Sequence, residues 1–156
     1  MKNFNLEERV SKARQFFKEG GYNCCQAVVM AYADLFDIDM KTAASISSGF
    51  GGGMGRMREV CGAVSGMLFV YSNLKGYSDP KATKEKMETY AAVQELMGKF
   101  KNKNGSYICR ELIGEQEASR NPMPAERTSE YYKKRPCVML VGDAAEILEE
   151  CLKAEQ

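Results

Sequence analysis

The fold is decided mainly by one stretch of sequence, residues 57–74, which reads MREVCGAVSGMLFVYSNL. Beyond its first three residues the stretch carries no charge, so it does not show the polar face expected of a surface helix. We therefore predict a buried central helix over about residues 57–74, with the other helices packed around it. The segment 60–74 is uncharged but falls short of the roughly 20 apolar residues that cross a bilayer, so we expect no membrane span.

Three helices are predicted before this stretch, and each begins at a side chain that suits an N-cap. These caps are Asn5, Asn23 and Asp39, whose side-chain oxygens can accept a hydrogen bond from a backbone N–H of the first turn. The first helix would end at Gly20-Gly21, and the third would cover residues 40–48.

Two more helices are predicted after the central one. Asp79-Pro80 is a typical helix start, and Asn104-Gly105 is a typical end, so a long helix is expected between them. Ser106 can then cap a short helix over residues 107–113.

The C-terminal part divides into an irregular connection and a last helix. Residues 114–135 contain two prolines and many polar residues, so we expect an irregular segment with about one helical turn. The last helix should run from Pro136 to Lys153, although residues 138–141 could instead form a short strand. The sequence as a whole predicts one all-α domain, residues 1–156, built as a bundle of about five or six helices.

The composition points to sulfur chemistry. The 156 residues are 44% hydrophobic and 28% charged, as in an ordinary globular protein, but they include six cysteines and no histidine. Without histidine, a Ser-His-Asp or Cys-His nucleophile, an imidazole metal ligand and a histidine-ligated c-type haem are all excluded. Any zinc or iron site would have to use cysteine and carboxylate alone.

Charge and targeting signals give mostly negative expectations. The net charge is +1 with the signs mixed along the chain, which argues against nucleic-acid binding through a broad basic face. Residues 1–8 are polar and charged, so they do not form a signal peptide. We expect a cytoplasmic protein. The cytoplasm keeps thiols reduced, so the six cysteines are interpreted as reactive or metal-binding rather than as structural disulfides.

Four predicted helix starts each carry a cysteine in the first turn: Cys24, Cys61, Cys109 and Cys137. The unpaired N–H groups and the positive end of the helix dipole favour an anion at such a position, so thiolates are expected there. Cys25 lies beside the first of these residues. A core-packing role is the alternative for each, because free cysteine is among the most buried residue types.

Other features would modify these thiols. Inward-turned arginines would also favour the thiolate, and the sequence offers Arg56, Arg58, Arg110 and Arg135. Cys151 falls in the last turn of the final helix, where the dipole disfavours a thiolate, so it is interpreted as a spare cysteine.

Glycines surround the central cysteine. Gly62 and Gly66 leave the helix face around Cys61 bare, either for close contact with another helix or as room for a partner sulfur, a metal or a substrate. The glycine-rich loop 49–55, with Gly52 and Gly53 at its centre, could bind an anion or shape access to Cys61, although it matches neither the P-loop nor the Rossmann pattern.

These motifs together resemble the C_GCAxxG_C_C family, which is named for redox activity. The resemblance rests on the sequence NCCQAV at residues 23–28, CGAVSG at 61–66, CREL at 109–112 and Cys137 before the final helix. It implies that the family's four cysteines correspond to Cys24, Cys61, Cys109 and Cys137, with Cys25 and Cys151 as additions. It implies redox activity but no particular substrate.

Three hypotheses follow. The first is a thiol–disulfide protein that needs no cofactor and acts on an unidentified redox partner or small molecule, with pairs such as Cys24 with Cys61 or Cys109 with Cys137. The second is a module in which the same four cysteines ligate zinc, copper(I) or an iron–sulfur cluster. The third is a structural or interaction domain whose cysteines only pack. The oligomeric state is left open by all three.

Overall fold

The predicted all-α fold is confirmed by the computed structural model, which describes residues 4–155. Within that range six helices have seven or more residues, in agreement with the five or six expected: α1 Leu6–Lys18, α2 Cys24–Met30, α3 Met40–Ser47, α5 Gly62–Lys75, α6 Thr83–Asn104 and α9 Cys137–Ala154. The remaining segments are short: α4 Gly51–Met54, α7 Cys109–Ile113, α8 Ser129–Lys134, and the 3-10 turns η1 Ala33–Leu35, η2 Ser48–Phe50 and η3 Glu115–Glu117.

The three N-caps predicted from the sequence are confirmed. Asn5 accepts a hydrogen bond from the Glu8 N–H, and Asp39 accepts one from the Thr42 N–H. Asn23 forms a capping box, because its side chain accepts from the Gln26 N–H while the Gln26 side chain accepts from the Asn23 N–H. The caps thus fix where α1, α2 and α3 begin.

Three predicted boundaries are wrong. The central helix α5 begins at Gly62 rather than near residue 57, because the preceding backbone is extended and Val60 pairs with Ile108 in an antiparallel bridge. The long helix α6 begins at Thr83, since the Asp79 carboxylate accepts from the Lys81 N–H and closes a turn instead of capping a helix. Helix α7 begins at Cys109, after Ser106 has accepted from the Ile108 N–H.

The C-terminal half otherwise follows the expectation. Helix α6 ends at Gly105 in a left-handed conformation, and the connection over residues 114–135 is irregular apart from η3 and α8. Residues 138–141 belong to α9 and are helical, so the alternative of a short strand is wrong. Burial of Leu140 and Val141 against the core explains their apolar character without a strand.

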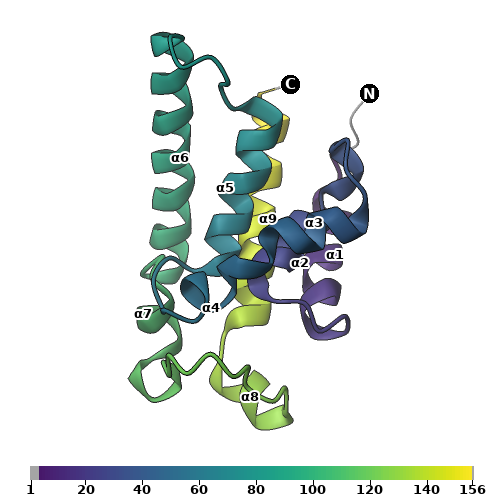
Figure 1. Ribbon diagram of the computed structural model, residues 1–156, viewed down its shortest axis with the longest axis vertical. Coiled ribbons are helices and arrows are strands. Elements are labelled where there is room, and N and C mark those ends of the chain that lie inside the picture. The colour runs from purple at the N-terminus through teal and green to yellow at the C-terminus, as the bar shows by residue number, and fades with distance from the viewer. Residues whose placement is uncertain (1–3, 156) are drawn as a thin grey trace.

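Helix α5 lies at the centre of the packing, between α2, α6 and α9 (Figure 1). Its buried residues include Val64, Met67 and Val70, each fully excluded from solvent. The N-terminal ends of α5 and α9 lie in the lower half of the molecule in Figure 1, towards the end that carries α4, α7 and α8. Residues from distant parts of the sequence therefore meet at this end.

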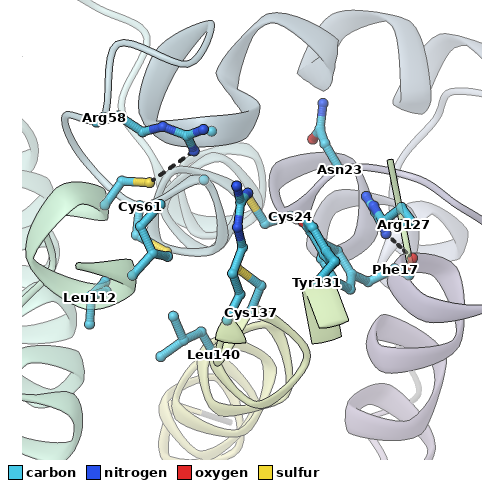
Figure 2. A pocket seen from close by; sticks show the side chains of 15 residues that line it. Phe17, Asn23, Cys24, Arg58, Cys61, Leu112, Arg127, Tyr131, Cys137 and Leu140 are labelled. Carbon is cyan, nitrogen blue, oxygen red and sulfur yellow. Dashed lines mark hydrogen bonds between the residues drawn. The ribbon is translucent and has the colours of Figure 1, made fainter. Parts of the chain in front are cut away.

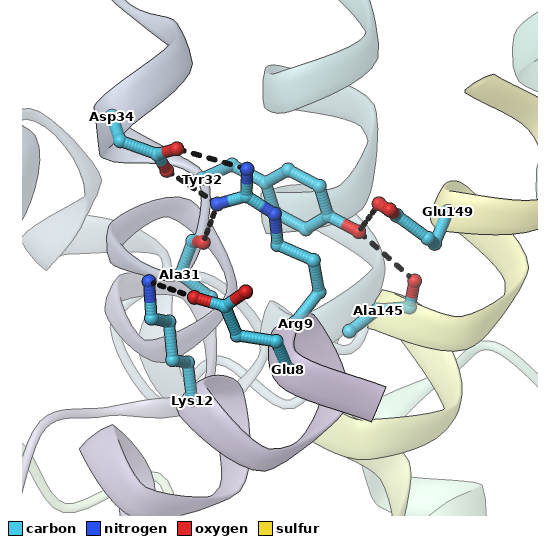
Figure 3. A network of polar contacts seen from close by, with 8 residues as sticks. All are labelled: Glu8, Arg9, Lys12, Ala31, Tyr32, Asp34, Ala145 and Glu149. Atoms are coloured by element: carbon cyan, nitrogen blue, oxygen red, sulfur yellow. Dashed lines mark hydrogen bonds and ion pairs between the residues drawn. The ribbon is translucent and has the colours of Figure 1, made fainter. Parts of the chain in front are cut away.

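A buried polar network holds α1, the η1 segment and α9 together (Figure 3). Arg9, with 1% of its surface exposed, pairs with Asp34, donates to the Ala31 carbonyl at 2.8 Å and lies over the Tyr32 ring. The Tyr32 hydroxyl donates to the buried Glu149 carboxylate at 2.8 Å, and burial raises the pKa of that carboxyl. This network lies away from the cysteines and serves the fold.

Among residues 4–155, no helix is both long enough and apolar enough to pass through a membrane.

Candidate functional site

The four cysteines of the predicted set line one small cavity of about 60 Å³, which we call the cysteine cavity (Figure 2). Cys24, Cys61, Cys109 and Cys137 come from four different helix starts separated by tens of residues in the sequence. None of the six cysteines forms a disulfide in the structure. The cavity walls are mainly apolar, with Phe17, Leu112 and Leu140 among them.

The predicted location of these cysteines at helix starts is confirmed. Cys24, Cys109 and Cys137 are the first residues of α2, α7 and α9, and Cys61 is the N-cap residue of α5. The cavity therefore lies where four helix N-termini meet.

An isolated antiparallel bridge joins the two segments that lead into Cys61 and Cys109. Val60 pairs with Ile108, the Cys61 N–H donates to the Tyr107 carbonyl at 2.8 Å, and the Cys109 N–H donates to the Glu59 carbonyl at 2.6 Å. Each cysteine directly follows a residue of this bridge and then enters a helix. The bridge thus links the start of α5 to the start of α7.

Gly62 allows the Cys24 sulfur to approach the start of α5. A Cβ added at Gly62 would lie 2.4 Å from the Cys24 Sγ and 2.9 Å from the Phe50 carbonyl oxygen, both far inside van der Waals contact. Only glycine leaves room for this sulfur next to Cys61. Gly66 acts differently, since its missing side chain allows close packing against Cys25 and Val28 of α2, outside the cavity. Gly62 thus leaves room for a sulfur, whereas Gly66 allows close contact between two helices.

The glycine-rich loop makes a left-handed turn beside the cavity. Residues 52–56 all have positive φ, which glycine adopts at no steric cost. The N–H groups of residues 55–59 bond to carbonyls of the same loop, so they are not available to an anion. Gly52 lines the cavity, while a Cβ at Gly53 would lie 2.7 Å from the Cys109 Cβ. Of the loop's predicted roles, shaping the surroundings of the cysteines is the one this geometry favours.

Three residues other than glycine, in the loop or directly after it, also have a left-handed backbone. Met54, Arg56 and Arg58 have φ values of 68°, 65° and 63°. Such conformations are strained for residues with a Cβ and persist where the surrounding structure imposes them. At Arg58 the geometry turns the side chain to the cavity, where its Nη1 lies 3.7 Å from the Cys109 Sγ (Figure 2).

The prediction that helix starts would give easily ionised thiols is wrong for Cys61. Burial raises the pKa of Cys61 well above its usual range, and a charge on the nearby Cys24 would raise it further. The N–H groups of Ala63 and Val64 in the first turn of α5 act in the opposite direction but do not outweigh burial. A neutral thiol is therefore the resting form of Cys61.

Burial also dominates the pKa values of Cys109 and Cys137. It raises the pKa of Cys109 although Arg58 acts in the opposite direction, and it raises the pKa of Cys137 to about 12 although Arg135 and Arg127 favour the thiolate. A charge on Cys24 would raise both pKa values as well. Cys24 thus lies within electrostatic reach of all three other cysteines of the cavity.

The two additional cysteines lie outside the cavity. Cys25 is 2% exposed, packs in the core, and has its pKa raised to about 12, mainly by burial. Cys151 lies in the last turn of α9, 3.9 Å from the Glu155 carboxylate, and burial followed by that charge raises its pKa. The interpretation of Cys151 as a cysteine apart from the others agrees with this position.

Two residues of the cavity were not found from the sequence. Arg127 and Tyr131 belong to the segment 114–135, for which the sequence predicts only a connection. Arg127 donates to the carbonyls of Phe17 and Tyr22 and stacks on the Phe17 ring, so it fastens the segment over α1. Arg110, in contrast, pairs with Glu59 and does not line the cavity. Nothing in the local sequence distinguishes an inward-facing arginine from an exposed one.

The metal alternative requires that several thiols or carboxylates converge on one point. Over the described part of the chain, no group of three or more Cys, Asp or Glu side chains is arranged so that it could hold a metal ion. The four thiols share a cavity, but as placed they do not form a ligand cluster.

The fold and the site define an all-α protein with four clustered free thiols. The family model described as "Putative redox-active protein (C_GCAxxG_C_C)" matches residues 22–151, and the chain belongs to this family. The match covers all four cysteines of the cavity and confirms the resemblance seen in the sequence. No curated protein and no solved structure matches the chain.

Proposed function

We propose that the protein carries out thiol–disulfide exchange, in which two thiols of the cysteine cavity are oxidised by a disulfide substrate. The observation that carries this proposal is the meeting of the family's four cysteines in one cavity, while Cys25 and Cys151 lie elsewhere. Membership in a family named for redox activity supports redox chemistry in general, without naming the reaction.

Cys24 is the proposed attacking thiol. It is half-buried, whereas Cys61 and Cys109 are 6% and 7% exposed, and burial disfavours the thiolate of the other three cysteines of the cavity. Cys24 and Cys137 are thus the two more exposed thiols of the cavity, and of these Cys137 has its pKa raised to about 12, so we assign the attack to Cys24.

Cys61 is the proposed resolving thiol. The Cys24 sulfur lies against Gly62, the residue next to Cys61, and the protonation of the two thiols is linked by charge. The pairing of Cys24 with Cys61 thus has more support in the geometry than any pairing that involves Cys25 or Cys151.

The exchange balances in two steps. The Cys24 thiolate attacks one sulfur of a disulfide RS–SR, which forms a Cys24–SR bond, breaks the S–S bond and releases RS⁻. Cys61 then loses its proton to solvent and attacks the Cys24 sulfur, forming the Cys24–Cys61 disulfide and releasing the second RS⁻. The substrate gains two electrons and the protein loses two. A dithiol donor would reverse these steps and restore the reduced protein.

Oxidation with a small disulfide tests this proposal. The reduced protein should release about two equivalents of small thiol per chain, and non-reducing peptide mapping should find a Cys24–Cys61 disulfide. Cys24→Ser should abolish the fast release, and Cys61→Ser should stop at a mixed disulfide on Cys24 with about one equivalent released.

The matched control is Cys151→Ser, which removes a half-buried cysteine outside the cavity and should leave both the rate and the amount of release unchanged. If Cys25 or Cys151 carries the oxidation instead, or if no thiol of the folded protein reacts, the proposal is wrong.

A further inference from the structure

A second hollow, which we call the arginine recess, adjoins the cysteine cavity. It has a volume of about 390 Å³ and is lined by four arginines: Arg56, Arg58, Arg127 and Arg135. Three of the four, all except Arg56, also line the cysteine cavity, so the two hollows share a wall. No Asp or Glu is among the described residues that line the recess.

Most of this positive charge has no carboxylate partner within the described chain. Arg56 donates to the carbonyls of Asn121 and Met123, and Arg127 donates to the carbonyls of Phe17 in α1 and Tyr22 in the connection to α2. Only Arg135 forms an ion pair, with Glu117 at 3.0 Å. Backbone carbonyls orient a guanidinium but do not neutralise it, so the recess holds an excess of positive charge.

Arg58 adds an independent indication that the recess binds an anion. Its side chain is 2% exposed, its Nε donates to the Ser119 carbonyl, and its Nη1 faces the Cys109 sulfur. Its Nη2 is buried and has no hydrogen-bond partner among the residues that the structure describes. A buried, unpaired donor on a cation is costly, and an anion bound in the recess would lie beside this guanidinium, since Arg58 is one of the residues that line it.

The cations are held apart and in place. Tyr131 contacts both Arg127 and Arg135, whose guanidinium carbons lie 5.5 Å and 4.6 Å from its ring centre. Desolvation and the charges of Arg58 and Arg135 lower the pKa of Arg56, which shows that these like charges are close. Repulsion between fixed cations is relieved when an anion binds among them, so the recess is preorganised for one.

We propose that the substrate of the cysteine cavity is a small disulfide bearing an oxyanion, such as a carboxylate, which the arginine recess binds while the sulfur reaches Cys24. This inference rests on the proposed function and adds the chemical class of its substrate. The recess is large enough for the anionic part of such a molecule, and the smaller cavity takes the sulfur end. The electron balance is that of the exchange given above.

Disulfides of different charge test this inference. The reduced protein is mixed with dithiodiglycolate, bis(2-hydroxyethyl) disulfide or cystamine, which are anionic, neutral and cationic, and the rate of thiol loss is measured. Arg56→Gln removes a cation of the recess that forms no ion pair within the described chain. It should slow the anionic disulfide about five- to tenfold while changing the neutral one little, because one favourable charge interaction is worth about 1 kcal/mol.

The neutral disulfide reports any general disturbance of the loop, since that would change all three rates. The matched control is Arg14→Gln, the same loss of charge at an exposed residue of α1 that lines neither hollow. Charge selectivity should also weaken with added salt. If Arg56→Gln changes the three rates by the same factor, or if Arg14→Gln has the same selective effect, the inference is overturned.

Binding without exchange separates this inference from the proposed function. The Cys24→Ser variant is titrated with dithiodiglycolate by calorimetry, with bis(2-hydroxyethyl) disulfide as the comparison. Binding of the anion alone, together with unreactive thiols in the native protein, would uphold the recess and reject the exchange. Thiol oxidation without preference for the anion would uphold the exchange and reject the recess.

Discussion

At the scale of single residues, Gly62 explains why a cysteine of α2 and the start of α5 can be so close. The Cys24 sulfur occupies the space that any side chain at residue 62 would fill. The glycine that follows Cys61 in the sequence CGAVSG, residues 61–66, is therefore explained by packing. Gly66, four residues later, permits the close approach of the same two helices.

Gly62→Ala should lower the free energy of unfolding by about 1–3 kcal/mol, because the new methyl group overlaps the Cys24 sulfur and the Phe50 carbonyl. It should also change the reaction rate of Cys24, since that sulfur must move. Denaturant unfolding and thiol labelling under reducing conditions measure the two effects.

The control for this change is Gly98→Ala in α6, where a Cβ would meet nothing within 4 Å. There alanine should stabilise the protein by up to about 1 kcal/mol through its higher helix propensity and leave the thiols unaffected. Equal effects of the two substitutions would contradict the steric role of Gly62.

At the scale of elements, the site depends on where helices begin. Asn23 caps α2 and so fixes Cys24 as its first residue, and the Asn23 side chain also donates to the Ser48 carbonyl at 2.9 Å. Asn5 caps α1 in the same manner, but it does not line the cysteine cavity. The two caps thus allow stability and site geometry to be separated.

Asn23→Ala and Asn5→Ala should each lower the free energy of unfolding by about 1 kcal/mol, the usual effect of losing an N-cap. Only Asn23→Ala should speed the alkylation of Cys24, because fraying of the first turn of α2 exposes that sulfur. Rates of iodoacetamide labelling, read by mass spectrometry of Cys24 peptides, check this. The same rate in both variants would show that the cap does not control access to the thiol.

At the scale of the whole molecule, the burial of several thiols links stability to pH. Burial raises the pKa of Cys25 and Cys137 to about 12, and it raises those of Cys61 and Cys109 as well. A raised folded-state pKa means that the folded protein holds these protons more tightly than the unfolded chain. Their contribution to stability is complete below about pH 9 and is lost as the pH rises towards 12.

The reduced protein should therefore lose free energy of unfolding steadily above about pH 9. Cys137→Ala should make this loss shallower by up to about 1.4 kcal/mol per pH unit, which corresponds to one proton. Asn5→Ala, which lowers stability by another cause, should leave the slope unchanged. Urea unfolding at several alkaline pH values measures the slopes, and parallel curves for all three proteins would refute the assignment.

Prediction from sequence succeeded where the cause is local. The caps at Asn5, Asn23 and Asp39 and the end at Gly105 depend on hydrogen bonds within a few residues, and each is confirmed. The start of α5 was misplaced because a distant partner decides it: Val60 pairs with Ile108, which holds the chain extended up to Cys61. The raised thiol pKa values were missed for a similar reason, since burial is a property of the packed molecule.

By itself, the sequence determined the helical class, the cysteines at four helix starts and the small residues beside Cys61, because capping, periodicity and residue size act over short distances. Only the tertiary structure decided that these four starts meet in one cavity and that arginines from residues 56–58 and 127–135 gather beside it. The physical reason is that such proximity comes from the packing of α2, α5 and α9 and from the course of the segment 114–135. Neither is encoded in the spacing of the residues it brings together.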